Sequence, residues 1–144
     1  MAVIKGYEAW ATVAFQAPID ANNADITLPS SATGIDMSLW DELLVIIEIG
    51  VTAGTVALDL RDSPTTNGSY TAIAGKTKTT LATDDGNIYI IALNVSELNP
   101  LARFVRAYQD NNAASQLMAI LILGKAVNPP ATDNKLAAQQ AVID

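Results

Sequence analysis

The sequence predicts an all-β fold, an antiparallel β-sandwich or jelly-roll-like domain of about eight strands followed by a C-terminal tail that is extended or partly helical. Apolar residues recur at every second position in short runs, as in strands that bury one face. Turn-forming residues separate the runs at intervals of roughly ten residues, which favours antiparallel strands over a parallel sheet with crossover helices. We expect one sandwich domain over residues 1–125, in which residues 1–8 can form an N-terminal arm, and a tail over residues 126–144.

The first half of the domain is expected to begin with two short strands, at residues 9–15 and 25–28. A helix at residues 37–44 and a turn that leads into a strand are equally compatible with that segment. The first strong run is residues 43–51 (LLVIIEIGV), which is nearly apolar on both faces and has Glu48 as its only charge. We therefore expect this strand to lie at the centre of a sheet.

The middle of the chain predicts a hairpin. Residues 55–61 alternate between an apolar face and a polar face that should meet water. Residues 62–69 combine Pro with Asn-Gly, which is typical of a turn between paired strands. The return strand is expected at residues 70–73 and, after Gly75, at the Thr-rich segment 77–83.

Three strands are expected to complete the domain. Residues 88–95 (IYIIALNV) should be buried on both faces, and residues 101–108 should place Phe104, Arg106 and Tyr108 on one face and Arg103 on the other. Residues 117–123 have no polar face, so the side turned away from the core needs a second sheet, a loop or another subunit to cover it. Oligomerisation is therefore expected.

The tail offers two interpretations. Lys125 and the residues up to Pro130 are not expected to continue a strand. Residues 135–143 contain good helix formers, with Leu136 and Ile143 on one stripe, but so short a helix is marginal alone in water. Both an arm that docks on a neighbouring chain and a frayed terminus remain open.

Composition excludes several classes of function. Eight Lys and Arg against fifteen Asp and Glu give a net charge of −7, so nucleic acid is not an expected partner. The chain has no Cys and no His, which removes thiolate chemistry, disulfides and imidazole-based proton transfer. Its longest apolar run is far shorter than the roughly eighteen residues of a membrane span. The N-terminus lacks a signal-peptide pattern, so synthesis in a cytoplasm and no membrane partner are expected.

No motif predicts catalysis, a cofactor site or a metal site. Gly75-Lys76-Thr77 resembles the end of a phosphate-binding loop, but Tyr70 stands where that loop needs a glycine. Residues 84–87 (DDGN) offer oxygen ligands without the later carboxylate of a calcium loop, and are expected to form a hairpin turn. We therefore expect a protein that is not an enzyme and binds no cofactor.

Seven side chains are candidates for contacts with other molecules: Tyr7, Trp10, Trp40, Arg103, Arg106, Leu136 and Ile143. The two arginines are expected to meet carboxylates such as Asp59, across strands or across an interface. Aromatic residues of sandwiches belong most often to a core or an interface. Tyr7, Trp10, Trp40 and Tyr70 could also stack on sugars, so a carbohydrate-binding module is the alternative function.

From residue 43 to residue 124, the order of features resembles the head decoration or cement proteins of tailed phages. The stretches that carry the resemblance are LLVIIEIG, TVALDLRDSP, NGSYTAI, IYIIALNVSELNP, ARFVRAY and AILILG. The resemblance implies a β-sandwich that assembles as a homotrimer on the outside of an icosahedral head and clamps neighbouring subunits of the major capsid protein.

The expected function is therefore that of a structural virion protein. It would be made in the host cytoplasm and would stabilise the outer capsid surface of a bacteriophage as an oligomer. An acidic protein suits a shell exterior, away from packaged DNA. Binding to the assembled lattice and not to its free subunits stabilises the lattice by mass action, without turnover. The alternative is a carbohydrate-binding β-sandwich module of a phage tail or a secreted protein.

Overall fold

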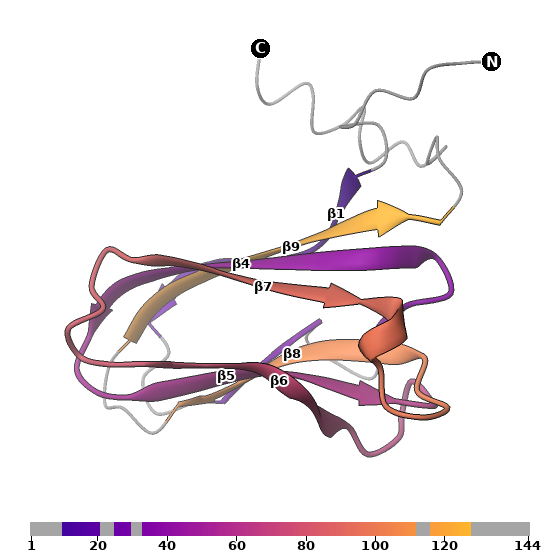
Figure 1. Cartoon of the computed structure of the whole chain (residues 1–144). Coiled ribbons are helices and arrows are strands. Elements are labelled where there is room, and N and C mark those ends of the chain that lie inside the picture. Colours follow the sequence, from indigo (N-terminus) through magenta and orange to yellow (C-terminus); the bar gives the residue numbers. More distant parts are fainter. Residues whose placement is uncertain (1–9, 21–24, 30–32, 112–115, 128–144) are drawn as a thin grey trace, which may run out of the picture.

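The computed structural model describes residues 10–20, 25–29, 33–111 and 116–127. These ranges hold nine strands and a short 3-10 helix, packed as two antiparallel sheets face to face (Figure 1). The predicted all-β antiparallel sandwich is confirmed. The elements are β1 (Trp10–Asp20), β2 (Ile26–Leu28), β3 (Ile35–Asp36), β4 (Trp40–Thr52), β5 (Val56–Ser63), β6 (Thr71–Thr80), β7 (Ile88–Asn94), η2 (Val95–Glu97), β8 (Phe104–Asn111) and β9 (Gln116–Ala126).

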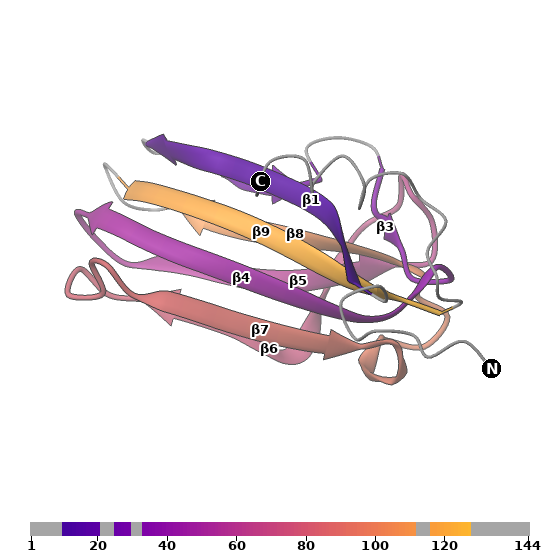
Figure 2. The ribbon, with the colours of Figure 1, turned by 90° about the horizontal axis from the view of Figure 1, so that it is seen from above.

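The strand order is that of a jelly roll. Sheet A has the order β1-β9-β4-β7, and sheet B has the order β2-β8-β5-β6, with β3 also paired to β8. The pairs are nested, because β1 pairs with β9, β2 and β3 with β8, β4 with β7, and β5 with β6. A long antiparallel ribbon rolled into two sheets gives this nesting. Viewed from above, β7 of sheet A lies over β6 of sheet B, and β1 lies at the opposite side (Figure 2).

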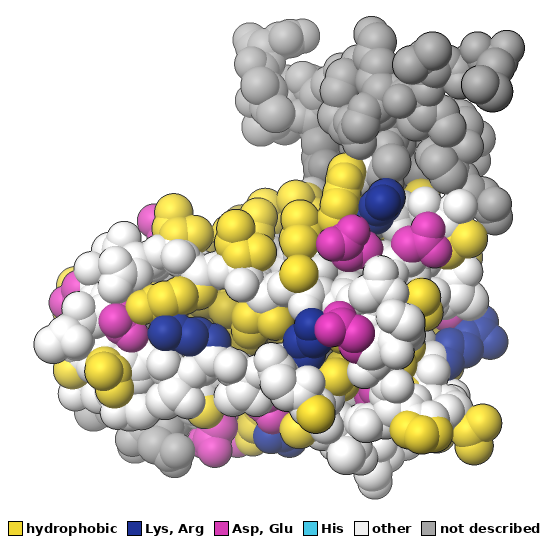
Figure 3. Space-filling view, in the orientation of Figure 1, with side chains coloured by type: hydrophobic (Ala, Val, Ile, Leu, Met, Phe, Trp, Pro, Cys, Tyr) yellow, Lys and Arg dark blue, Asp and Glu magenta, His cyan; other side chains and the backbone are white. Residues whose placement is uncertain are grey.

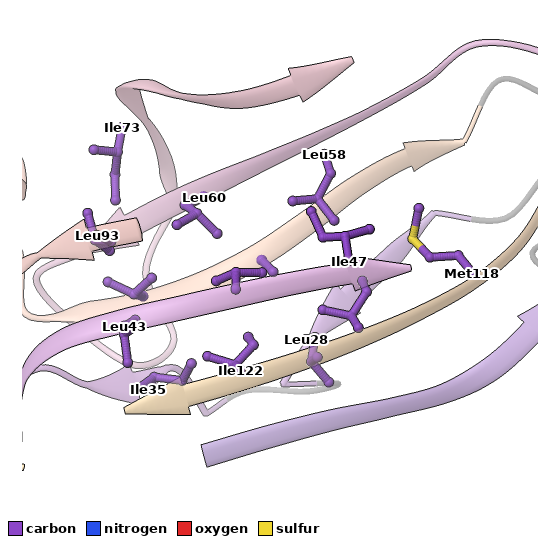
Figure 4. Close-up of a cluster of buried hydrophobic side chains, with 14 of the residues drawn as sticks. Leu28, Ile35, Leu43, Ile47, Leu58, Leu60, Ile73, Leu93, Met118 and Ile122 are labelled. Atoms are coloured by element: carbon purple, nitrogen blue, oxygen red, sulfur yellow. The ribbon is translucent and has the colours of Figure 1, made fainter. Parts of the chain in front are cut away.

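The core lies between the sheets and is built from alternate residues of the strands (Figure 4). Strand β4 pairs with both β9 and β7, so its predicted central place is confirmed. The side chains that are no more than 1% exposed include Leu43, Val45, Ile47 and Ile49 of β4, Leu58 and Leu60 of β5, Leu93 of β7, and Met118, Ile120 and Ile122 of β9. Both central strands of sheet A thus give one face to the same core.

The structure decides one open alternative and corrects one local prediction. The helix alternative at residues 37–44 does not form, because the Asp36 side chain accepts a hydrogen bond from the Ser38 N–H at 3.0 Å and sets a turn before β4. Residues 70–73 and 77–83 were expected to form the return strand of the hairpin, and most of them do. They belong mostly to the single strand β6, in which Gly75 takes a φ of 74° at an irregularity in the pairing with β5. Residues 84–87 form a turn, but it carries the chain from sheet B to sheet A and closes no hairpin.

The boundaries of the domain differ slightly from expectation. Strand β9 continues through Ala126, one residue into the predicted tail. The hairpin between β5 and β6 is confirmed. Most of the predicted tail and the whole of the predicted N-terminal arm, with Tyr7, Leu136 and Ile143, lie outside the described residues.

Gly124 provides a test of the core packing. It is buried in β9, and a Cβ there would lie 2.6 Å from atoms of both the Trp40 ring and Val13. Neither atom belongs to the end of a long flexible side chain, so the strands would have to move apart. We expect Gly124→Ala to lower the free energy of unfolding by about 1–3 kcal/mol in urea titrations.

The matched control is Ala74→Val, which enlarges an exposed side chain of β6 and should change stability by no more than about 0.5 kcal/mol. Equal effects of the two substitutions would contradict the packing described here.

Candidate interaction surfaces

The outer face of sheet A is apolar across its whole width. We call it the apolar face, and it comprises Phe15 of β1, Leu121 and Leu123 of β9, Leu44 and Ile46 of β4, and Ile88 and Ile90 of β7. Phe15, Ile88 and Ile90 are 60%, 64% and 63% exposed. Hydrophobic side chains stand along the upper side of the molecule, where sheet A lies (Figure 3). Contiguous apolar patches on protein surfaces are often functional, so this face is a candidate interaction surface.

The register of the strands aligns these residues in rows. One row contains Phe15, Leu121, Ile46 and Ile90, and the row beside it contains Thr12, Leu123, Leu44 and Ala92. With a strand spacing of about 4.8 Å and a rise of about 3.3 Å per residue, the band covers roughly 300 Å². That is the size of the largest apolar patch on a typical monomer, which is often functional.

The prediction that β7 is buried on both faces was therefore wrong. Only its inner face meets the core, through Leu93, Ile91 and Tyr89. In the described part of the chain, no element lies over the outer face of sheet A. A cover for this apolar outer face is not found within the described residues.

Charged residues border the apolar face at both ends. Glu42 of β4 and Lys125 of β9 are Cα partners at one end, and Glu48 follows the band at the other. The ion pairs found among the described residues include none of these three side chains. Within the described part of the chain, these three side chains thus form a charged border of the apolar face that is not neutralised by ion pairs.

The outer face of sheet B has a different character and carries arginine stacked on tyrosine. Arg61 lies 3.6 Å from the centre of the Tyr108 ring, and its Nε donates a hydrogen bond to Asp59 at 2.9 Å. The Tyr108 hydroxyl donates to Asp25 at 2.8 Å, and this hydrogen bond raises the pKa of Tyr108. We call these residues, with the Arg106 pair described next, the arginine–tyrosine face.

Arg106 makes the second stacked pair. Its guanidinium lies 4.0 Å from the centre of the Tyr70 ring, and Nη2 donates to the Thr66 carbonyl at 2.9 Å. The Tyr70 hydroxyl donates to the same carbonyl at 3.1 Å, and burial raises the pKa of Tyr70. The predicted shared face of Phe104, Arg106 and Tyr108 is confirmed by the alternation of β8.

Arg106 does not meet Asp59 across strands, and a carboxylate across an interface stays a prediction. Asp59 is bound by Arg61 of its own strand, and the Nε of Arg106 is buried without a hydrogen bond. The stacked arginines also reduce the surface that a sugar could stack on. One face of the Tyr108 ring and one face of the Tyr70 ring already carry an arginine guanidinium. Arg61 and Tyr108 were not among the predicted site residues. The sequence signal for Arg61 was its place on the polar side of the alternating segment 55–61.

Arg103 forms an ion pair at one end of the sandwich. It precedes β8 and forms a two-point ion pair with Asp36 of β3, with Nε–Oδ1 and Nη2–Oδ2 distances of 2.8 and 2.7 Å. The hydrogen bonds from Arg103 hold the pKa of Asp36 well below its usual range. The expectation that Arg103 meets a carboxylate across strands is confirmed, with Asp36 as the partner, and the contact secures the turn before β4.

The two predicted tryptophans differ in their surroundings. Trp40 is half-buried, packs against the core and lies over Gly124. Trp10 is half-buried at the start of β1, where it is a Cα partner of Lys125. Trp40 is thus a core residue, and Trp10 lies beside one end of the apolar face.

Lysines occupy the open groove between the edges of the two sheets. Residues 75–78 of β6 and 89–92 of β7 line this groove, which has a volume of about 320 Å³. The Lys76 ammonium donates to the Ala92 carbonyl and to Glu97, both at 2.7 Å, and the Lys78 ammonium lies 3.9 Å from the centre of the Tyr89 ring. Lysines placed at strand edges hinder the addition of a foreign strand.

Comparisons with known proteins give no relative. No protein-family model matches the chain, and no curated protein is similar to it in sequence. Among the described residues, no group of three or more acidic side chains is placed to hold a metal ion. The described part of the chain also contains no helix that is long and apolar enough to cross a membrane.

The ion pair of Asp36 and Arg103 predicts a pH dependence of stability. Because the pKa of Asp36 lies below its unfolded value of 3.8, its contribution is present above about pH 4 and is lost as the pH falls from there towards the folded-state pKa. The Arg103 side chain is 55% exposed. We therefore expect Asp36→Asn to lower the free energy of unfolding by no more than about 1 kcal/mol at pH 7.

Urea titrations at pH 7 and pH 2.5 measure this difference, which should shrink at the lower pH. Asp41→Asn is the control, since Asp41 forms no ion pair with a described residue. A difference between wild type and Asp36→Asn that is the same at both pH values would be the contrary result.

Proposed function

We propose that this protein is a structural virion protein, a capsid decoration or cement protein that binds the outer surface of a phage head as an oligomer and stabilises neighbouring major capsid subunits. The observation that carries the proposal is the apolar face, which leaves one side of a well-packed sheet to be covered by another molecule. The resemblance of residues 43–124 to cement proteins supplies the kind of partner. It implies a homotrimer.

In this proposal the arginine–tyrosine face contacts the shell. Tyrosine and arginine are among the residues that contribute most to protein interfaces. Here Arg61 and Arg106 are held against tyrosine rings, so little side-chain freedom is left to lose on binding. The face lies opposite the apolar face, because the two sheets turn their outer sides away from each other (Figure 1). One surface can thus meet the shell while the other meets a further copy.

A decoration protein acts by mass action and needs no chemical step. Each copy that binds only the assembled lattice adds to lattice stability in proportion to its occupancy. The net charge of −7 suits the outside of a shell, because an acidic protein inside would face the phosphates of packaged DNA. The net negative charge, the apolar face and the arginine–tyrosine face together support a protein that lies on the outside of a shell and catalyses no reaction.

Sedimentation with bare capsids of tailed phages tests the function. We expect the full chain to co-sediment with the capsids and to raise the temperature at which they lose their subunits. A protein that stays in the supernatant at every concentration, but is retained on a glycan array, would instead support the carbohydrate-binding module.

A matched pair of tyrosine variants tests the surface. Tyr108→Ala should weaken binding to the capsids by at least about tenfold, as expected for a residue central to an interface. Tyr89→Ala is the control, since Tyr89 is also half-exposed and also lies against a cation, Lys78, but at the edge groove. Equal losses of capsid binding for both variants would indicate that the shell contact does not lie on the arginine–tyrosine face.

A further inference from the structure

We infer that the apolar face is covered by the same face of a second copy, in a two-fold pair whose axis runs along the strands. This inference goes beyond the proposed function, because a two-fold pair is a contact additional to the three-fold one that the resemblance implies. It assigns the surface through which two copies meet, and it names the contacts that fix their orientation.

The size and layout of the apolar face fit an interface between copies. A standard interface buries about 800 Å² on each partner, with an apolar centre and a polar rim. The band of roughly 300 Å² would form the centre. Glu42, Lys125 and Glu48 lie where the rim would be. Most closed pairs of identical chains are two-fold and use the same patch on both subunits.

Two orientations bring the faces together with their strands aligned, as packed sheets prefer. If the axis runs along the strands, β9 lies over β4 of the partner and each row meets the same row. If the axis runs across the strands, β4 lies over β4 of the partner and the row of Glu42 meets the row of Glu48. The order of strands and the row assignments follow from the strand pairing.

Charge distinguishes the two orientations. With the axis along the strands, Lys125 faces Glu42 of the partner subunit, and the symmetry repeats this contact. With the axis across the strands, Glu42 faces Glu48 of the partner subunit, which places like charges together. The first orientation is therefore the favoured one.

Two of the three most exposed side chains of the apolar face agree with this choice. Phe15 on β1 and Ile90 on β7 lie in one row at opposite sides of sheet A. An axis along the strands places Phe15 over Ile90 of the partner subunit. These side chains are 60% and 63% exposed in the single chain, so the pairing removes exposed apolar area of both from water.

The symmetry restricts the number of copies. A two-fold pair alone gives a dimer of the 15.1 kDa chain. If the chain also forms the trimer implied by the resemblance, pairing on the apolar face joins two trimers into a hexamer. The mass in solution should therefore correspond to two or six copies.

Light scattering coupled to size-exclusion chromatography tests the pairing on the full chain. Ile90→Lys places a charge against Phe15 of the partner subunit without emptying the core, and should raise the dissociation constant of the pair at least tenfold. Leu81→Lys is the control, because Leu81 is 55% exposed but lies in the turn after β6, away from the apolar face. A wild type with a mass of one or three copies, or an unchanged Ile90→Lys mass, overturns the inference.

A charge exchange tests the orientation. Lys125→Glu and Glu42→Lys should each weaken pairing with themselves, because both interface contacts then join like charges. A mixture of the two variants should form mixed pairs, in which both contacts join opposite charges again. A change that acted only within one chain would not be restored by mixing, and failure of the mixture to pair overturns this orientation.

Capsid sedimentation of Ile90→Lys separates this inference from the proposed function. Loss of pairing with retained capsid binding supports both. If the wild type is a monomer and Ile90→Lys abolishes its capsid binding, the apolar face contacts the capsid protein. That result overturns the pairing and supports the function. Wild-type protein that pairs but binds no capsid retains the pairing and overturns the function.

Discussion

Strands β4 and β9 carry large apolar side chains on both faces, and a strand in a two-sheet sandwich can give only one face to the core. The inner residues Ile47 and Ile122 are about 1% exposed, so this requirement is fully met on one side. On the other side, Leu44, Ile46, Leu121 and Leu123 shield one another only in part. No described residue covers the remaining apolar area, and its burial by another molecule would contribute about 25 cal/mol per Å².

The ends of the sandwich are held by polar contacts that leave both outer faces unobstructed. The Asp62 side chain, 2% exposed, accepts hydrogen bonds from the backbone and side chain of Asn99 at 2.7 and 2.8 Å. At the opposite end of the strands, the Asp85 side chain accepts from the Thr52 N–H at 3.0 Å. Such bonds to charged groups are about twice as strong as neutral ones, so a few of them fix the long connections between sheets.

The sequence predicted the class of fold because the alternation in segments such as 55–61 depends only on which residues are apolar. It did not predict the burial of β7, because Ile88 and Ile90 look like core residues and only the strand order shows that nothing within the described chain covers them. The arginines show the same limit. Arg103 and Arg106 were singled out by charge, whereas their partners, Asp36 and Tyr70, lie far away in the sequence and are fixed by tertiary structure.

The way in which the edges of the sheets are closed also bears on how copies meet. An open strand edge would let a neighbour add a strand, and such growth has no natural end. At the groove between β6 and β7, Lys76 occupies the Ala92 carbonyl and Lys78 covers the Tyr89 ring, so strand addition there would have to displace both cations. A face-to-face contact across a two-fold axis closes on itself instead. In the proposed pair, the lysines would oppose strand addition at this edge, and the leucines and isoleucines of the apolar face would form a contact that closes.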